Sequence, residues 1–292
     1  MTLPLPQPPT STSTCYRHPD REAGRRCTRC GRPACTECLV QADVGSQCVD
    51  CYRSGRPDAR TRARYWSASQ PALVTYALIA VNVAVFVWMA LSDPDNLTGR
   101  RITQEAVDLG LVKLARVGFD DFIGTAVGEW YRIVSSGFLH FGFFHLAFNM
   151  LLLFQLGMLL EPVVGRVRFL LLFAAALLGG SAGVLVVSPY ELTGGASGAV
   201  FGLLAAAAVA LHHRGINPLT TGIGTTIMLN LLITFTLPNV SIGGHLGGLL
   251  TGAVAGWFVA APKHRHYPVA LTYAAPLAVV IASLVVAYVA GS

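Results

Sequence analysis

Residues 169–187 spell FLLLFAAALLGGSAGVLVV, a run without a charged side chain. At about 1.5 Å per residue, a helix of this length nearly crosses the ~30 Å hydrocarbon core of a bilayer. This stretch therefore predicts a helical membrane protein.

Six more apolar runs flank this one and are separated by polar loops. They occupy about residues 72–91, 144–160, 195–211, 222–237, 244–260 and 269–290. Some are shorter than the usual twenty residues of a membrane span. We expect an all-α polytopic membrane protein, with a six-helix bundle followed by a seventh, C-terminal transmembrane helix.

The composition divides the chain into a polar head and an apolar remainder. Of all residues, 53% are hydrophobic and 12% are charged, which is about half the charged share of an ordinary soluble domain. We predict a metal-binding head at 1–53, a basic juxtamembrane linker at 54–71 with Trp66 at the membrane interface, a helical core at 72–262, and a loop with the additional helix at 263–292. The net charge of +6 does not indicate nucleic acid, because the apolar part offers no basic face or aromatic platform.

The loop charges predict the orientation. Basic residues concentrate on the cytoplasmic side of membrane proteins. With the head inside, sixteen of the 21 Lys and Arg lie on the cytoplasmic side. The other five basic residues lie in the long first loop, where acidic residues outnumber them. We expect an integral cell-membrane protein with its N-terminus in the cytoplasm and its C-terminus outside.

All seven cysteines lie in the head, and with one histidine they form four pairs of the C-x2-C or C-x2-H type. Each pair can bind one metal from a tight turn, and eight ligands fill two structural zinc sites with no open position. No secretory run precedes them, so we expect reduced thiols in the cytosol. The expected ligands are Cys15, His18, Cys27, Cys30, Cys35, Cys38, Cys48 and Cys51.

The spacing alone leaves the pairing of these half-sites open. The head resembles a small B-box-like or cross-brace zinc finger. That resemblance implies alternate pairing, with Cys15, His18, Cys35 and Cys38 on one zinc and the other four on the second. Sequential pairing is the alternative. The closed sites indicate a structural or protein-binding module rather than a second enzyme.

Few polar residues occur within the apolar runs, and they decide the class of membrane protein. Beyond residue 143 the only acids are Glu161 and Glu191, both near the ends of runs. An ion carrier or proton pump is expected to bury carboxylates, which argues against those classes. The remaining polar positions of interest converge at one depth in the predicted topology: His145, Asn149, Ser197 and His245.

Ser197 has the surroundings of an exposed nucleophile. It lies in Gly194-Gly195-Ala196-Ser197-Gly198 at the start of a run. Flanking glycines let a substrate backbone approach, and the free N–H groups of a helix N-terminus can stabilise an oxyanion. Small residues also allow close helix packing, so this motif alone does not establish catalysis.

His245 lies in GGHLGG at 243–248, followed by Gly252 and Gly256. Glycines four residues apart let this helix lie close to that of Ser197, where the imidazole can act as general base. No aspartate follows Asp121, and Glu191 is the only candidate carboxylate, so a Ser–His dyad is the simpler hypothesis. His145 and Asn149 share one helix face, where an interhelical hydrogen bond is the alternative role.

Three motifs in this order resemble the rhomboid intramembrane serine proteases: HFGFFHLAFN at 140–149, GASG at 195–198 and GGHLGG at 243–248. The resemblance covers about residues 72–290. It implies that Ser197 is the nucleophile and His245 its base. It also implies an oxyanion hole formed by Asn149, His145 and the backbone N–H of Ser197.

Looser matches accompany these motifs. Trp130-Tyr131-Arg132 is similar to the family's Trp-Arg element, with one extra residue between the two. Glu161 matches an acid at the inner end of the second span, although a solvated helix-end carboxylate is the alternative. Phe201 stands where many relatives carry tyrosine, so we expect ring packing on the histidine without a hydroxyl role.

The resemblance predicts an intramembrane serine endopeptidase that cleaves transmembrane or juxtamembrane bonds of other membrane proteins and needs no cofactor for catalysis. A catalytically silent rhomboid-like binding or quality-control factor is the alternative, but it should lack Ser197 or His245. The expected partners are single-span or polytopic membrane proteins, the lipid bilayer and a cytosolic protein that binds the head, but not nucleic acid.

Overall fold

The computed structural model describes residues 13–42, 44–55, 71–238, 240–262 and 267–292. Contacts divide the chain into two compact units, Met1–Trp66 and Ser67–Ser292. Most of the predicted basic linker, including Trp66, lies outside the described residues.

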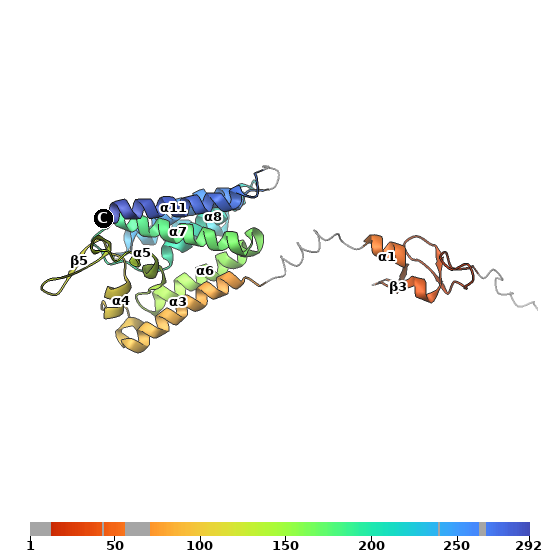
Figure 1. Cartoon of the computed structure of the whole chain (residues 1–292), viewed down its shortest axis with the longest axis horizontal. Helices are drawn as coiled ribbons and strands as arrows, with labels where there is room; N and C mark the ends of the chain where they lie inside the picture. Colours follow the sequence, from red (N-terminus) through yellow and green to blue (C-terminus); the bar gives the residue numbers. More distant parts are fainter. Residues whose placement is uncertain (1–12, 43, 56–70, 239, 263–266) are drawn as a thin grey trace, which may run out of the picture. The chain divides into compact units, whose positions relative to one another are not determined.

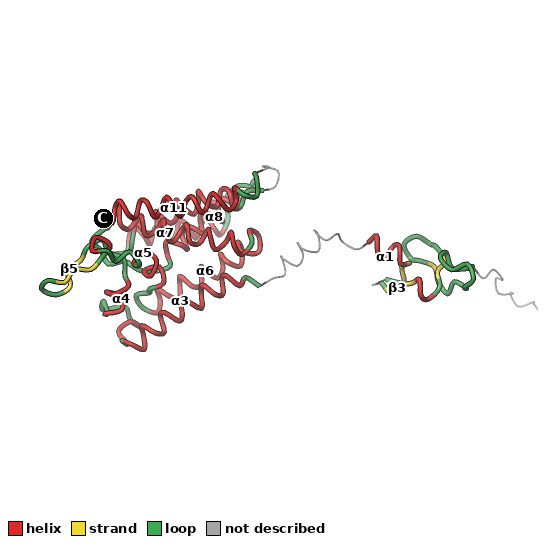
Figure 2. Tube along the Cα trace, in the orientation of Figure 1, coloured by secondary structure: helices red, strands yellow, loops and turns green. Residues whose placement is uncertain are grey.

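The described part of the chain is mostly helical (Figures 1 and 2). Its α-helices are α1 Val49–Gly55, α3 Leu73–Ser92, α4 Gln104–Leu109, α5 Arg132–Ser135, α6 Phe143–Val164, α7 Arg166–Val187, α8 Ser197–His212, α9 Gly222–Thr236, α10 Ile242–Val259 and α11 Leu271–Gly291. Its 3-10 turns are η1 Thr36–Cys38, η2 Pro94–Leu97, η3 Thr125–Val127, η4 Ser136–Phe138 and η5 Pro218–Thr220. Its strands are β1 Arg25–Arg26, β2 Pro33–Ala34, β3 Leu39–Gln41, β4 Ser46–Cys48, β5 Ala115–Val117 and β6 Asp121–Ile123.

The head is built from two antiparallel ribbons, β1–β2 and β3–β4, followed by α1. Its buried apolar side chains are mainly the cysteines themselves. The guanidinium of Arg32 lies over the ring of Tyr16, 4.5 Å from its centroid, and pairs with Asp50 at 3.3 Å. A domain this small cannot bury enough apolar surface to be stable without cross-links or metals.

All seven expected apolar runs form helices in the membrane unit. Five of these are long and apolar enough to cross a membrane: α3, α6, α7, α10 and α11. The other two, α8 with 16 residues and α9 with 15, are shorter. The chain is therefore an integral membrane protein of polytopic type, and the exact number of its spans stays a prediction.

Helix α7 is the most buried of the long helices and lies at the centre of the unit. Figure 1 shows α11 running along α7, and α3 running along α6. The main core contains side chains of α6, α7 and α8, including Leu153, Phe169 and Leu203. The bundle thus encloses α8, the helix that begins at Ser197.

Helix α10 packs closely on two neighbours because glycines line two of its faces. A Cβ at Gly248 or Gly252 would collide with the backbone of Gly198 or Gly202 in α8. On the other face, Gly243 and Gly247 lie against the backbone of α7, at Gly183 and Gly179. The approach to α8 agrees with the sequence prediction, whereas the second glycine face was not predicted.

Glu161 joins α6 to the start of α3. Its carboxylate accepts hydrogen bonds from the N–H groups of Val74 and Thr75, at 3.0 and 2.8 Å, and from Thr75 Oγ1 at 2.7 Å. An anion is stabilising at a helix N-terminus, where backbone N–H groups have no partner in the helix. The alternative of a solvated carboxylate is wrong, because Glu161 is buried at the α3–α6 contact.

The long first loop is more structured than the sequence indicated. It contains α4, α5 and the antiparallel ribbon β5–β6, which turns at Gly118 with a φ of 87°. Its centre is Arg132, which is 1% exposed and donates to Glu129 Oε2 at 2.8 Å. Arg132 also donates to the carbonyls of Val107 and Gly110, at 2.6 and 2.7 Å.

The end of α11 contacts this loop. Thr125 Oγ1 donates to the carbonyl of Gly291 at 2.9 Å, and the rings of Trp130 and Tyr288 lie 5.3 Å apart. The seventh helix therefore supports the first loop as well as covering α7.

Candidate functional site

Ser197 is the first residue of α8. The N–H of a first helical residue has no partner within its helix, so it is free to bind an anion. Gly195 precedes it with a φ of +133°, and a Cβ there would come within 2.8 Å of the His145 ring. Only glycine fits this position without strain, and its presence lets the His145 ring approach the start of α8.

His245 projects from the first turn of α10 toward Ser197. Its Nε2 lies 2.8 Å from Ser197 Oγ, which is hydrogen-bond distance. The ring of Phe201, one turn along α8, stacks on the imidazole with centroids 4.0 Å apart and planes inclined by 15°. Sequence and structure therefore agree on the placement of these three side chains.

The other nitrogen of the His245 ring contacts Thr234, a residue that no sequence motif indicated. Nδ1 lies 2.7 Å from Thr234 Oγ1, near the end of α9. Thr234 is 1% exposed. No motif marks it, because α9 carries several threonines at positions that face in different directions.

His145 and Asn149 lie on one face of α6, beside the start of α8. His145 Nδ1 accepts a hydrogen bond from the N–H of Phe141 at 3.2 Å. Nδ1 is therefore unprotonated in the neutral ring, and Nε2, on the side of Gly195, carries the hydrogen. Asn149 Nδ2 donates to the carbonyl of His145 at 2.8 Å, which leaves its second amide hydrogen free of that bond.

Segments of the first loop hold the residues before Ser197 in place. Leu111 and Thr193 exchange backbone hydrogen bonds at 2.8 Å, and the N–H of Gly195 donates to the carbonyl of Ser136, also at 2.8 Å. These bonds fix the backbone that leads into Ser197, so the loop positions the start of α8 through main-chain contacts.

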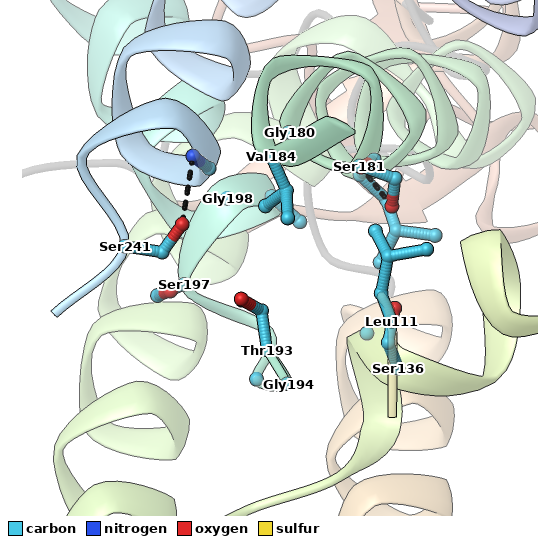
Figure 3. Close-up of a pocket in the computed structure, with 15 residues that line it drawn as sticks. Leu111, Ser136, Gly180, Ser181, Val184, Thr193, Gly194, Ser197, Gly198 and Ser241 are labelled. Atoms are coloured by element: carbon cyan, nitrogen blue, oxygen red, sulfur yellow. Dashed lines mark hydrogen bonds between the residues drawn. The ribbon is translucent and has the colours of Figure 1, made fainter. Parts of the chain in front are cut away.

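A small pocket, partly open to the surface, lies beside Ser197. Figure 3 shows Ser197 and Ser241 on one side, Thr193 and Gly194 nearby, and Ser181 and Leu111 on the other side. The hydroxyl of Ser181 donates to the carbonyl of Ile133 at 2.7 Å. Many of the lining residues are glycines: Gly137, Gly180, Gly194, Gly195, Gly198 and Gly244.

The sequence of this chain is similar to those of known proteins. Residues 127–262 match the family model of the Rhomboid domain. Rhomboid protease GluP of Bacillus subtilis (strain 168) is 34% identical over 207 residues, or 70% of this chain and 38% of that protein. YdcA of the same strain is 34% identical over 151 residues, or 50% of this chain and 75% of that protein. The chain belongs to the rhomboid family.

A plant relative extends the comparison. RHOMBOID-like protein 5 of Arabidopsis thaliana is 40% identical over 138 residues, or 44% of this chain and 44% of that protein. The chain thus spans less than half the length of GluP and of this plant protein. The Rhomboid match begins within the first loop and includes His145, Asn149, Ser197 and His245.

The looser family matches also have defined places in this rhomboid unit. Arg132 of the Trp-Arg element is the buried centre of the first loop, and Trp130 packs on α11. Glu191 is exposed in the loop before Ser197. In a catalytic triad, a carboxylate would bind His245 Nδ1. Here that nitrogen contacts Thr234.

The head contains two clusters of metal-ligand type. One holds Cys15, His18, Cys35 and Cys38, and the other holds Cys27, Cys30, Cys48 and Cys51, with the ligand atoms of each cluster within 4.8 Å of one another. All seven cysteines are free thiols. Alternate half-sites therefore lie together, whereas sequential pairs do not share a cluster.

The spacing within these clusters fits zinc. Tetrahedral Zn–S bonds of about 2.3 Å place two sulfurs about 3.8 Å apart, and a sulfur and an imidazole nitrogen about 3.5 Å apart. The sulfurs of Cys30 and Cys48 are 3.8 Å apart, and His18 Nδ1 lies 3.5 and 3.4 Å from the sulfurs of Cys35 and Cys38. A disulfide would require about 2.05 Å.

Proposed function

We propose that this rhomboid-family chain is an intramembrane serine endopeptidase that cleaves transmembrane or juxtamembrane peptide bonds of other membrane proteins. Its catalytic pair is Ser197 and His245. The observation that carries the proposal is the 2.8 Å contact between Ser197 Oγ and His245 Nε2 at the N-terminus of α8. The names of the rhomboid relatives support the same class of enzyme.

The first step of this proposal is the formation of an acyl-enzyme. Ser197 Oγ transfers its proton to His245 Nε2 and attacks the carbonyl carbon of the scissile bond, whose π electrons move to the oxygen. His245 then gives the proton to the departing amine nitrogen as the C–N bond breaks. An unactivated hydroxyl is a poor nucleophile at neutral pH, so the reaction requires both side chains.

In the second step, water replaces the amine. His245 accepts a proton from the water, whose oxygen attacks the ester carbonyl. The bond to Ser197 Oγ then breaks, and Oγ takes the proton back from His245. The chain needs no cofactor for either step. The pocket bounded by glycines beside Ser197 suits a small side chain next to the scissile bond.

Three donors around Ser197 are proposed to stabilise the negative oxygen of the tetrahedral intermediates. They are the backbone N–H of Ser197, Nε2–H of His145 and the free amide hydrogen of Asn149. Support comes from the helix N-terminus at Ser197, from the Phe141 bond that places the His145 hydrogen on Nε2, and from the position of Asn149 one turn along the same face. Each is an uncharged donor, which a membrane interior tolerates better than a cation.

The test uses purified full-length protein in proteoliposomes with a panel of single-span substrates, beside Ser197→Ala. We expect the wild type to cleave at least one substrate and to react with a serine-directed fluorophosphonate. The variant should do neither while its thermal unfolding is unchanged. Cleavage by Ser197→Ala at the wild-type rate would overturn the proposal.

For the head we propose two structural zinc ions, held by the two clusters in a B-box-like fold. The support is the donor chemistry and the tetrahedral spacing of the ligand atoms. With all four positions of each metal filled by protein, zinc would cross-link the ribbons rather than activate water. We propose that the head binds a cytosolic protein partner.

The proposed topology has the head in the cytoplasm and residue 292 outside. It is supported by the excess of Lys and Arg in the head and in the loops on the same side. In this orientation, the first turns of α8 and α10, which carry Ser197 and His245, lie near the outer face. Glu161 lies near the cytoplasmic face. The proposed domains are the head at 1–53, the linker at 54–71, the six-helix core at 72–262 and the final segment at 263–292.

A further inference from the structure

Thr234 is the buried hydroxyl that contacts His245 from α9, a helix that otherwise packs little. Of its 15 residues, only Gly224 and Thr234 are buried. The side chain of Thr234 is directed into the bundle and is 1% exposed. Its hydroxyl therefore lies where few other groups can replace its hydrogen bonds.

The hydroxyl oxygen has two close neighbours, and it has only one hydrogen. Thr234 Oγ1 lies 2.6 Å from the carbonyl oxygen of Asn230 and 2.7 Å from His245 Nδ1. A carbonyl oxygen can only accept, so the hydroxyl hydrogen points to Asn230. The oxygen must then accept at its other contact, which requires a hydrogen on His245 Nδ1.

This arrangement fixes the state of the nitrogen that faces Ser197. A neutral imidazole carries one hydrogen, so a protonated Nδ1 leaves Nε2 with its lone pair exposed. Nε2 lies 2.8 Å from Ser197 Oγ and is thereby ready to accept the serine proton. The opposite tautomer would place the N–H of Nε2 against the serine, and His245 could then not act as a base.

We propose that Thr234 is a positioning residue that holds His245 in the tautomer and orientation required of a general base. This inference rests on the proposed protease function and adds to it a neutral partner in the place of a triad carboxylate. When His245 carries the serine proton, the contact to Thr234 becomes a charge-assisted hydrogen bond, which is stronger than a neutral one. A hydroxyl can supply this without the cost of a buried anion in a membrane span.

The test compares three variants of the full-length protein. Thr234→Val keeps the shape of the side chain and removes the hydroxyl, and Thr234→Ser keeps the hydroxyl. Thr236→Val is the matched control, because Thr236 makes the same kind of bond, to the carbonyl of Leu232 at 2.7 Å, but faces outward on the same helix. The measurements are kcat and KM on one cleaved substrate, the rate of fluorophosphonate labelling, and thermal unfolding.

We expect Thr234→Val to lower kcat and the labelling rate by about 10- to 100-fold with little change in KM. Thr234→Ser should restore most of the rate, and Thr236→Val should match the wild type. Wild-type kcat and labelling in Thr234→Val would overturn the inference. The inference would also be overturned if Thr234→Ser lost as much activity as Thr234→Val. That result would indicate that the packing of the side chain matters and not its hydroxyl.

A spectroscopic measurement separates this inference from the protease proposal. In ¹⁵N-histidine-labelled protein, the shifts of the two His245 nitrogens report which one carries the hydrogen, whether or not a substrate is cleaved. We expect the Nδ1–H tautomer in the wild type and a mixture in Thr234→Val. An Nε2–H tautomer in the wild type would refute the role of Thr234. Absence of cleavage and labelling in a wild type with the expected tautomer would refute only the protease function.

Discussion

In the proposed oxyanion hole, Asn149 and His145 each contribute one hydrogen atom, so their substitutions should have graded effects. Loss of one oxyanion donor typically costs about 10²–10³ in rate. We expect Asn149→Ala to lower kcat by about this factor and His145→Ala to be no more severe. Ser197→Ala and His245→Ala should each abolish cleavage, because they remove the proposed nucleophile and its proposed base.

These effects can be read from initial rates on one substrate at saturating concentration, with circular dichroism to check that each variant is folded. Asn149→Ala as inactive as Ser197→Ala would contradict the graded order. It would indicate that the amide positions the substrate or the serine itself rather than acting as one donor of several.

The individual residues of the site differ in how well the sequence predicts them. Ser197 and His245 stand in glycine motifs whose chemistry is recognisable, and His145 and Asn149 share a helix face by their spacing. Thr234 has no such signal, because its contact with His245 depends on how α9 turns into α10. That turn brings together residues eleven positions apart on two different helices, and no helical periodicity describes it.

At the scale of elements, the close crossing of α8 and α10 brings His245 to Ser197. A Cβ at Gly252 would collide with the backbone of Gly202, which cannot move aside without shifting a helix. We expect Gly252→Ala to destabilise the protein by about 1–3 kcal/mol, as overpacking typically does, and to reduce cleavage by separating the two helices. Thermal unfolding and kcat measure the two effects.

Gly222→Ala is the matched control for this substitution. Gly222 is also in a helix, at the start of α9, and a Cβ there would meet nothing within 4 Å. Its variant should keep the activity and stability of the wild type. Equal behaviour of the two variants would show that the α8–α10 crossing has more room than its backbone contacts indicate.

The first loop depends on an ion pair that is sensitive to acid. Burial raises the pKa of Glu129, but hydrogen bonds from Arg132 and from the N–H of Gly124 lower it by more, so its pKa lies below the ordinary value of 4.5. A lowered folded-state pKa stabilises the fold above the unfolded pKa, and this contribution is lost as the pH falls through the folded value. Protonation would also leave the buried guanidinium of Arg132 without its anion.

We therefore expect Glu129→Gln to lower the thermal midpoint at pH 7, by the equivalent of about 1.5–3 kcal/mol for a charged hydrogen bond. The difference between wild type and variant should shrink as the pH falls below 4.5, the ordinary pKa of a glutamate. A difference that stays constant between pH 7 and pH 3 would exclude ionised Glu129 as the stabilising group.

The sequence predicts some elements better than others. Each apolar run became a helix, because one continuous hydrophobic segment can satisfy its backbone in lipid by its own helical hydrogen bonds. The first loop could not be derived in this way. Its ribbon and its buried Arg132 depend on contacts with carbonyls some twenty residues away and with the end of α11, and these have no local periodicity.

At the scale of the whole molecule, the metal content tests the head. Metal analysis of the purified full-length protein should find two zinc ions per chain. Cys30→Ala should reduce this to about one, because Cys30 belongs to only one cluster. Ser197→Ala, prepared in parallel, should keep both. A folded wild-type head without zinc, or with disulfides, would refute the proposed sites.

The membrane topology can be tested by reporters fused at residue 1 and residue 292. Seven spans place the two ends on opposite sides, so a reporter active only in the cytoplasm should work at the first position and fail at the second. Both fusions reporting from one side would mean that an even number of helices crosses the bilayer. The short helices α8 and α9 would then be the first candidates for a helix that does not cross the bilayer.

The two glycine faces of α10 have a consequence for how this protein can vary. Positions 243 and 247 are closed by the backbone of α7, and positions 248 and 252 by that of α8. Leu246, Leu250 and Val254 are exposed on the remaining side. A library of all single substitutions in α10 should therefore give two stripes that accept almost nothing beside one stripe that accepts most apolar residues. On this basis we expect inherited changes in α10 to collect on its exposed side and to spare the glycines that face α7 and α8.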